Sequence, residues 1–289
     1  MSFRTVVISS TSRLNYKNKY LVVKHELDEK YIHISEIDTL IIDSISVSLT
    51  SYLLKELLDN KVNIIFCDDK HNPNSELIPF YSEYNTSKKI KYQINWSGDI
   101  KEKIWKKIVQ NKIKNQASII RKIDKEKYTK LLEYAKNVKD GDITNREGHA
   151  AKVYFNTLFG NNFSRNLDSD INRALNYGYA ILLSTINKEI INNGYITQLG
   201  IFHKSEFNQY NLTCDFMEPF RPIIDNFVYF NRKREFDSKY KMDLVNIFNT
   251  KFKYKNKLYT LKDIIRLYVY SVLESLTKRK KYEDFNYEG

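Results

Sequence analysis

The sequence contains few of the residues that break or cross-link a chain. Its 289 residues include four prolines, eight glycines and two cysteines. Cys67 and Cys214 lie in apolar surroundings and form no CxxC pair, which favours buried thiols over a disulfide or a metal site. No apolar run approaches the roughly 18 to 20 residues that a membrane span requires, and the N-terminus lacks the hydrophobic region of a signal peptide. We therefore expect a cytoplasmic protein with no membrane partner.

Several widespread functional motifs are also missing. The sequence has no Walker loop, no GxGxxG, no GxSxG and no heptad series, and we find no internal repeat. These absences argue against nucleotide-binding loops, a nucleophile elbow, a coiled coil and a solenoid.

Positive charge is the main excess. Forty-seven lysines and arginines outnumber 35 aspartates and glutamates, for a formal net charge of +12. This excess favours a polyanionic partner, either nucleic acid or an anionic membrane surface. Residues 101–130 hold 11 Lys or Arg against three acidic residues, and their charged face either is simply solvated or contacts phosphates. On the second interpretation, the candidate DNA contacts are Lys103, Lys106, Lys107, Lys114 and Arg121.

The apolar pattern divides the chain into a β-rich beginning and a helical remainder. Short β-branched and aromatic runs predict strands at residues 5–8, 20–23, 31–34, 39–42 and 62–67, and helical spacing predicts a helix at 48–59. Residues 68–90 contain two prolines, three asparagines and no clear period, as is typical of a linker. We predict an α+β protein with a small N-terminal β-rich domain (residues 1–72), a linker (73–90) and a larger α-helical domain (91–289).

Four further elements are predicted within the helical region. A long helical region begins near Ile90, and amphipathic spacing predicts helices at residues 169–193 and 261–277. Polar and apolar residues alternate in 251–260, which predicts a small basic hairpin.

The stretch from Leu199 to Asp225, LGIFHKSEFNQYNLTCDFMEPFRPIID, is rich in side chains that can do chemistry. It holds His203, one of only five histidines, together with Asp215, Glu218 and Arg221. These residues could form a functional site. They could equally be surface ion pairs beside a loop histidine, because structural ion-pair networks imitate sites.

The residues from about Cys214 onward have helical spacing. One apolar stripe is formed by Phe216, Phe220, Ile223 and Phe227, so Glu218 points away from the aromatic face. Pro219 either kinks this helix or occupies the first turn of a separate one. In both cases Glu218 is a carboxylate at a break in the backbone pattern.

A second candidate carboxylate lies in the segment DITNREGHAAKVYFNTLFG. Thr144, followed three residues later by Glu147, fits a capping box, which would make Glu147 a helix-start acceptor. Glu147 also shares a face with small alanines that would let a ligand approach. His149 is rotated by about 200° from it and faces elsewhere. If this helix holds a ligand, the residue that does so is Glu147.

The phrases NREGHAAKVYF, LGIFH and DFMEPFRPIID, in this order and at these separations, resemble the CRISPR-associated integrases, the family numbered one in the Cas series. The resemblance covers most of the chain and is specific, because three separate motifs occur in the right order. It implies that Glu147, His203 and Glu218 are the catalytic, metal-binding residues. Many members have aspartate at the last position, and glutamate there resembles members from type II systems.

The resemblance implies a metal-dependent DNA endonuclease and integrase of CRISPR adaptation. Such an enzyme joins the 3′-OH ends of a short DNA fragment, the prespacer, to the CRISPR repeat by transesterification. Two carboxylates and one imidazole suit Mg²⁺ or Mn²⁺. Asp215 could support the site from outside the ligand set, and Arg221 could orient Glu218 or bind phosphate.

The resemblance also implies partners. The family works on double-stranded DNA as homodimers, commonly formed through the N-terminal β domain and bridged by a small ferredoxin-like protein numbered two in the Cas series. The type II effector nuclease is a further partner that the resemblance allows. Two alternatives stay open: a non-enzymatic, basic nucleic-acid-binding protein, and a general metal-dependent nuclease unrelated to CRISPR.

Overall fold

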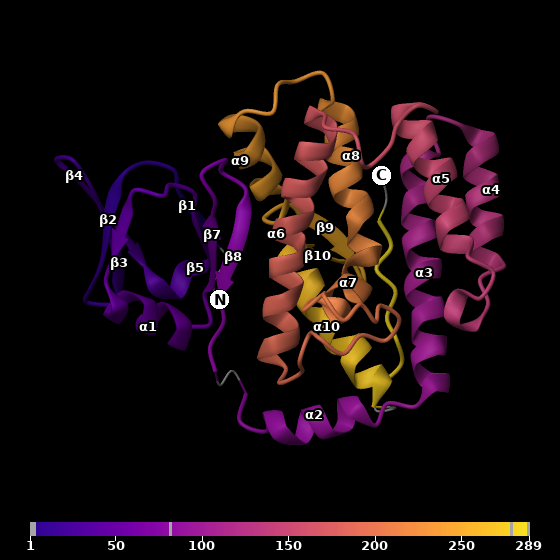
Figure 1. The fold of residues 1–289 in the computed structure, drawn as a ribbon, viewed down its shortest axis with the longest axis horizontal. Coiled ribbons are helices and arrows are strands. Elements are labelled where there is room, and N and C mark those ends of the chain that lie inside the picture. Colours follow the sequence, from indigo (N-terminus) through magenta and orange to yellow (C-terminus); the bar gives the residue numbers. More distant parts are fainter. Residues whose placement is uncertain (1–3, 81–82, 278–279, 288–289) are drawn as a thin grey trace. The chain divides into compact units, whose positions relative to one another are not determined.

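The computed structural model describes residues 4–80, 83–277 and 280–287. The chain falls into two compact units, residues 1–82 with 245–249 and residues 83–244 with 250–289. The first unit is β-rich and the second is mainly helical (Figure 1), which confirms the predicted α+β class. No helix in the described ranges has both the length and the apolar character needed to cross a bilayer.

The first unit contains two four-stranded sheets. Its elements are β1 (Arg4–Ile8), β2 (Ser12–Lys17), β3 (Tyr20–His25), β4 (Asp28–His33), η1 (Ile34–Glu36), β5 (Ile37–Ile42), β6 (Val47–Leu49), α1 (Ser51–Asp59), β7 (Asn63–Cys67) and β8 (Pro73–Leu77). The strand orders are β1-β5-β7-β8 and β4-β3-β2-β6. The strands β1, β5 and β7 run parallel and β8 antiparallel. In the second sheet β4, β3 and β2 are antiparallel neighbours.

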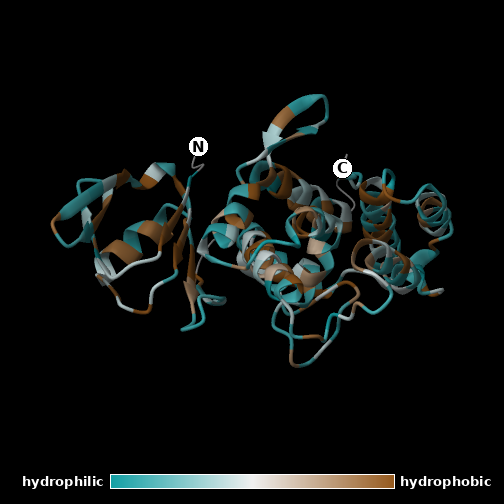
Figure 2. Ribbon diagram, turned by 90° about the horizontal axis from the view of Figure 1, so that it is seen from above, coloured by the Kyte–Doolittle hydropathy of each residue, from teal (hydrophilic) through white to brown (hydrophobic). Residues whose placement is uncertain are grey.

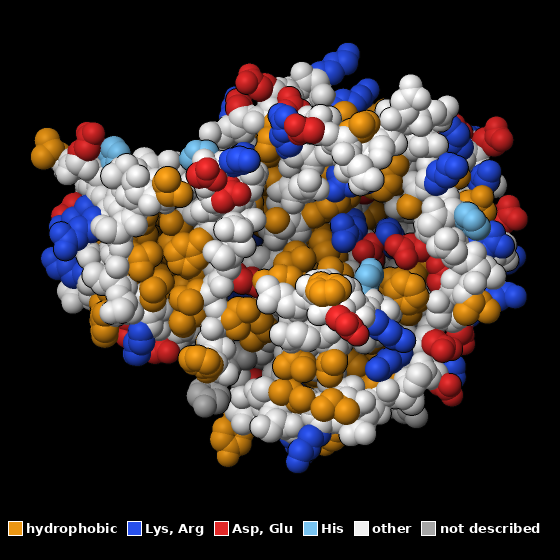
Figure 3. All heavy atoms as spheres, in the orientation of Figure 1, with side chains coloured by type: hydrophobic (Ala, Val, Ile, Leu, Met, Phe, Trp, Pro, Cys, Tyr) orange, Lys and Arg blue, Asp and Glu red, His pale blue; other side chains and the backbone are white. Residues whose placement is uncertain are grey.

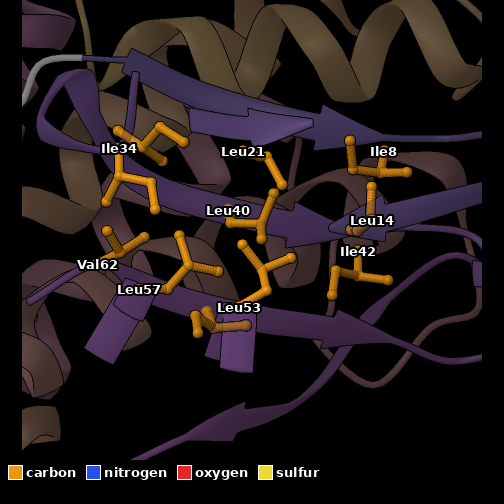
Figure 4. Close-up of a cluster of buried hydrophobic side chains, with 11 residues drawn as sticks. Ile8, Leu14, Leu21, Ile34, Leu40, Ile42, Leu53, Leu57 and Val62 are labelled. Carbon is orange, nitrogen blue, oxygen red and sulfur yellow. The ribbon is translucent and has the colours of Figure 1, made fainter. Parts of the chain in front are cut away.

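Apolar side chains from both sheets and from α1 meet in the core of this unit (Figure 4). Leu14 of β2, Leu40 of β5 and Leu53 of α1 are fully buried. The helix begins after Thr50, whose side chain accepts a hydrogen bond from the Leu53 N–H at 3.3 Å. This cap is the one that its sequence pattern predicts.

The structure corrects the sequence prediction at two places in this unit. Strand β2 was not predicted, because its segment SRLNYK is mostly polar and contains no β-branched residue. Residues 73–77, predicted to lie in the linker, form β8 and pair with β7. Pro73 is the first residue of β8 and lies opposite Cys67, where the register is irregular. A proline is tolerated there, because no regular hydrogen bond between the strands needs its missing N–H.

The second unit consists of helices and one hairpin. Its elements are α2 (Thr86–Ile94), α3 (Gly98–Ile120), α4 (Lys125–Lys136), η2 (Asp140–Asp142), α5 (Arg146–Phe159), α6 (Asp170–Asn192), α7 (Asn211–Met217), η3 (Glu218–Phe220), α8 (Arg221–Asn231), β9 (Lys251–Tyr254), β10 (Lys257–Thr260) and α10 (Leu261–Leu276), while α9 (Ser238–Ile247) extends into the residues grouped with the first unit. The predicted hairpin is confirmed, with Lys255 and Asn256 at φ values of 49° and 62°, as two-residue hairpin loops require. The β9–β10 hairpin projects from the helices in Figure 2, where both hydrophobic and hydrophilic residues are seen in the helices.

Helix α3 has 12 buried residues among its 23. Its Asn111 and Asn115 bind the backbone of the C-terminal segment: both side-chain amides donate to the Phe285 carbonyl, at 2.7 and 2.9 Å, and Asn115 accepts from the Tyr287 N–H at 2.9 Å. Phe285 is fully buried and stacks on Phe220 with ring centroids 4.8 Å apart. The last described residues therefore form part of the helical core.

Replacing Phe285 by Ala should destabilise the protein. A fully buried Phe lost to Ala costs about 3–5 kcal/mol, because a cavity adds to the lost transfer free energy. Phe207→Ala is the matched control, since the Phe207 side chain is 98% exposed and its loss should change stability by less than about 0.5 kcal/mol. Chemical denaturation measures both, and equal midpoints for the two variants would contradict the docking of the C-terminal segment.

Candidate active site

Three separate segments of the helical unit meet at one buried lysine. Lys112, in the middle of α3, places its Nζ 2.6 Å from Glu147 Oε1 and 2.5 Å from Glu218 Oε2. Only 10% of the Lys112 side chain is exposed. Two of the three residues predicted from the sequence are thus brought together, and both contact a cation.

Glu147 lies in the first turn of α5, but the predicted capping box is wrong. The cap residue is Asn145, which accepts from the Gly148 N–H at 3.2 Å. Asp142 accepts from the N–H groups of Arg146 and Glu147, both at 2.9 Å. Because these side chains satisfy the exposed N–H groups at the helix start, the Glu147 carboxylate is left for Lys112.

Glu218 begins the short 3₁₀ turn η3 between α7 and α8. Pro219 follows it at the start of this turn, so the proline marks a break between two helices, and Asn115 of α3 donates to the Pro219 carbonyl at 2.8 Å. Glu218 is 4% exposed and Asp215 is fully buried. The interpretation of these carboxylates as surface ion pairs is therefore wrong.

The charge of Glu218 is held by two cations. Arg221 donates from Nε to Glu218 Oε1 at 2.9 Å. Burial raises the pKa of Glu218, but Arg221 and Lys112 outweigh burial and hold the pKa at about 2. Lys112 Nζ lies 2.5 Å from Oε2, so each oxygen of the Glu218 carboxylate contacts a cation. Burial lowers the pKa of Lys112, yet Glu218 and Glu147 together raise it above its ordinary value.

His203 is fixed by Asp215 of α7. The Asp215 carboxylate lies 2.6 Å from His203 Nδ1 and accepts from the backbone N–H groups of Ile201, Phe202 and His203. The hydrogen bond to Asp215 raises the pKa of His203 above its ordinary value, against the opposing effect of burial. Because Nδ1 is engaged, Nε2 is the ring nitrogen left for a ligand.

The loop that carries His203 needs a glycine. A Cβ at Gly200 would lie 2.4 Å from the His203 carbonyl oxygen and 2.8 Å from Asp215 Oδ2. Phe202 of this loop stacks on Trp105 of α3 with ring centroids 4.3 Å apart. The histidine is therefore held both by the loop's packing and by Asp215.

The donor set has the chemistry of a hard divalent cation site. Across the described ranges, no three His, Cys, Asp or Glu side chains form a ready metal cluster, and it is an ammonium group that contacts both Glu147 and Glu218. That ammonium is a built-in cation at the position where the two carboxylates converge. The buried Glu218 Oε2 and the Asp215-held imidazole match what Mg²⁺ or Mn²⁺ sites use. The residues thus fit such an ion.

Basic side chains and the candidate site share a hollow of the helical unit. Figure 3 shows acidic, basic and histidine side chains gathered there. One cavity of about 820 Å³ adjoins His203 and is lined by Lys101 and Lys204 and by side-chain amides. A smaller one of about 130 Å³ adjoins Glu218. The site therefore has space on two sides.

Most of the predicted DNA-contacting residues lie elsewhere on α3. The exposed ones are Lys103, Lys107, Lys114 and Arg121. Their spacing of four, seven and seven residues places them on one face, about 180° from Lys112. Lys106 is half-buried and pairs with Asp140 at 2.9 Å. DNA contact by this face stays a prediction, and these residues do not line either cavity beside the site.

Sequence reasoning missed several residues that the structure places at or beside the site. Lys112 was counted within the basic run but not distinguished from it, and Asp142, Arg165 and Tyr179 were not considered. The only signal for Lys112 was its place among the apolar residues of its helix, which indicates a buried lysine. His149 is exposed, as its position on α5 predicts.

The fold and the site together define a class of protein: a β-rich unit joined to a helical unit that carries two carboxylates around a buried ammonium and a separate histidine held by a carboxylate. The sequence matches the family model of the CRISPR associated protein Cas1 over residues 5–245. The chain belongs to this family.

Individual relatives agree with this assignment. The CRISPR-associated endonuclease Cas1 of Neisseria meningitidis is 33% identical, over 78% of this chain and 74% of its own. The enzyme of the same name from Francisella tularensis subsp. novicida is 27% identical, over 94% and 95%. Among solved structures, a casposase bound to its integration product has a TM-score of 0.80 at 21% identity, covering 100% and 95%. A Cas1 protein from Thermotoga maritima has a TM-score of 0.75 at 16% identity, covering 98% and 100%, and these likenesses show the fold alone.

Asp225, behind the site, should make stability depend on pH. It accepts a hydrogen bond from the Tyr179 hydroxyl, and burial raises its pKa to about 6 against the effect of that bond. Between about pH 4 and 6 the folded protein keeps a proton that the unfolded chain has lost, so this carboxyl lowers stability as the pH rises. Asp225→Asn should therefore gain about 3 kcal/mol relative to wild type from pH 4 to pH 7.

Denaturation at several pH values measures this difference. The exposed Asp69 is the control, because Asp69→Asn should leave the profile unchanged. Parallel profiles for wild type and Asp225→Asn would show that Asp225 is not desolvated.

Proposed function

We propose that this protein is a metal-dependent DNA endonuclease and integrase of CRISPR adaptation. It joins the 3′-OH ends of prespacer DNA to the CRISPR repeat. The observation that carries this proposal is that Glu147 and Glu218, distant in the sequence, converge on one cationic group. A catalytic centre for phosphoryl transfer needs a cation, because negative charge on the reacting phosphate must be compensated. Two converging carboxylates provide a place that holds such a cation.

The residues of the site divide the work. Glu147, Glu218 and the Nε2 atom of His203 would hold Mg²⁺ or Mn²⁺. A bound ion of this kind neutralises charge on the attacked phosphate and activates the attacking hydroxyl. Asp215 holds the imidazole in one orientation through Nδ1. Arg221 keeps Glu218 ionised and in place through its Nε hydrogen bond.

The proposed reaction exchanges one phosphodiester for another. The 3′ oxygen of the incoming strand forms a bond to the phosphorus at the edge of the repeat, while the bond from that phosphorus to the outgoing 3′ oxygen breaks. The number of phosphodiester bonds is unchanged, so no nucleotide hydrolysis is needed. With water as the attacker, the same site cuts DNA as an endonuclease.

The proposed partners are double-stranded DNA, a second copy of the chain and the small ferredoxin-like protein numbered two in the Cas series. Support comes from the casposase solved with its integration product and from a Cas6-RT-Cas1–Cas2 complex, which has a TM-score of 0.75 to this chain. The type II effector nuclease is a further proposed partner, as is assignment to a type II system.

Removing a residue of the triad should abolish joining without abolishing DNA binding. Glu147→Ala, His203→Ala and Glu218→Ala should each lower strand joining by at least about 100-fold, because even residues outside a ligand set cost 10- to 100-fold when lost. DNA affinity should change little, since no basic side chain is removed. Joining to a plasmid that carries the repeat array, with Mg²⁺ or Mn²⁺, and binding by fluorescence anisotropy measure the two effects.

His149→Ala is the matched control for His203→Ala, because His149 is exposed on the same helix as Glu147. Joining must also need a 3′-OH on the incoming fragment. Equal joining of 3′-blocked fragments, or full activity of Glu147→Ala in EDTA, would favour the non-enzymatic DNA-binding alternative. DNA degradation without joining would favour a general nuclease.

A further inference from the structure

The smaller cavity beside Glu218 is lined by three cations, by the carboxylates of Glu218 and Asp225, by one amide and by two aromatic rings. It measures about 130 Å³, room for several water molecules, and its lining includes Lys112, Arg165 and Arg221. Lys112 and Arg221 are both bound to Glu218. Arg165 comes from the segment before α6 and takes no part in holding the carboxylates of the site.

Arg165 forms no direct ion pair with an acidic side chain among the residues that the structure describes. Its two terminal nitrogens donate to neutral amide oxygens, NH1 to Asn172 at 2.6 Å and NH2 to Asn176 at 2.5 Å. Nearby Arg173, in contrast, is paired with Asp168 and Asp170 at 2.9 and 2.8 Å. Arg165 is therefore oriented by its neighbours without being neutralised by them.

The ring of Tyr179 holds two guanidinium groups beside the same cavity. The Arg221 guanidinium carbon lies 4.6 Å from the ring centroid, and that of Arg165 lies 5.4 Å from it. The Tyr179 hydroxyl donates to the buried Asp225, so the ring cannot easily turn. Two like charges on one ring repel each other, and an anion that contacts both would relieve the repulsion.

A buried amide completes the lining. Gln116 is 1% exposed, and its Oε1 accepts no hydrogen bond from the part of the chain that the structure describes. Because Oε1 is an acceptor, a donor such as water would satisfy it, whereas a phosphate oxygen would not. This end of the cavity therefore suits a water molecule and not the anion itself.

We infer that this cavity is a phosphodiester subsite that binds a phosphate next to the reacting one. Guanidinium groups match the paired oxygens of a phosphate, and the cavity opens beside Glu218, where the backbone of a reacting strand must continue. The exposed basic face of α3 cannot serve this role, because it points about 180° away from Lys112. The inference rests on the proposed function, and the phosphate belongs either to the incoming strand or to the target strand.

A scan with neutral backbone linkages tests the subsite. Single methylphosphonates, which remove the charge of one phosphate, are placed in turn near the 3′ end of the incoming strand and around the target phosphate. Wild-type protein should lose about 10- to 100-fold in joining at one position, the worth of a charged hydrogen bond. Arg165→Met should lower joining of unmodified DNA by a similar factor. In this variant, the neutral linkage at that same position should cause no further loss of joining.

The strand that carries the sensitive position identifies the source of the phosphate. Arg173→Met is the matched control, because Arg173 is already paired with carboxylates, and it should behave as wild type. Arg165→Met that joins as well as wild type, or keeps the wild-type sensitivity at every position, overturns the subsite. A purely structural Arg165 would lower the melting temperature and leave the sensitivity pattern intact.

If Arg165→Met does not fold, Arg165→Lys keeps the charge but loses the paired N–H groups. Sensitivity at the critical position must then fall, and unchanged sensitivity overturns the subsite. Wild-type protein that joins no unmodified DNA would count against the proposed function itself. In that case, the affinity of the protein for each methylphosphonate-substituted DNA tests the subsite separately.

Discussion

The contact of one buried ammonium with two carboxylates is the constraint on which the rest of the site depends. Lys112 is held by the packing of α3, so Glu147 and Glu218 must come to it. Removing one partner from a buried ion pair costs about 3–5 kcal/mol, because the other charge is left uncompensated. The starts of α5 and η3 are thus fixed relative to α3 by charge, in addition to the apolar packing of their helices.

The remaining groups follow from the need to keep this charge cluster ordered. Asp142 and Asn145 satisfy the start of α5, so Glu147 does not have to. Asn115 joins the Pro219 carbonyl to the docked C-terminal segment. Asp215 uses both of its oxygens to hold the loop that carries His203. Of the side chains that position the site, Asp142, Asn115 and Asp215 are buried, whereas Asn145 is exposed.

The fold class and most strands could be predicted from the sequence, because the spacing of apolar residues is a local property of the chain. The sequence also indicated Glu147, His203 and Glu218 as candidates, since three motifs carry them. It could not distinguish Lys112 from ten other basic residues in the same run, because burial is decided by which helices pack together. Thr144 and Glu147 mimic a capping box, but the acceptors are Asp142 and Asn145, and no local pattern predicts the positive φ of 49° that both residues have. Arg165 lies in no motif, and only the tertiary structure brings it beside Glu218.

The most direct test of the central claim is anomalous diffraction from crystals of the DNA-free protein grown with Mn²⁺. The claim is that Lys112 occupies the position of a divalent cation between Glu147 and Glu218. The account predicts an anomalous peak in contact with both carboxylates and with His203 Nε2, and a Lys112 side chain displaced from between them. Lys112 still bridging the two carboxylates at saturating Mn²⁺, with no peak beside them, would contradict it.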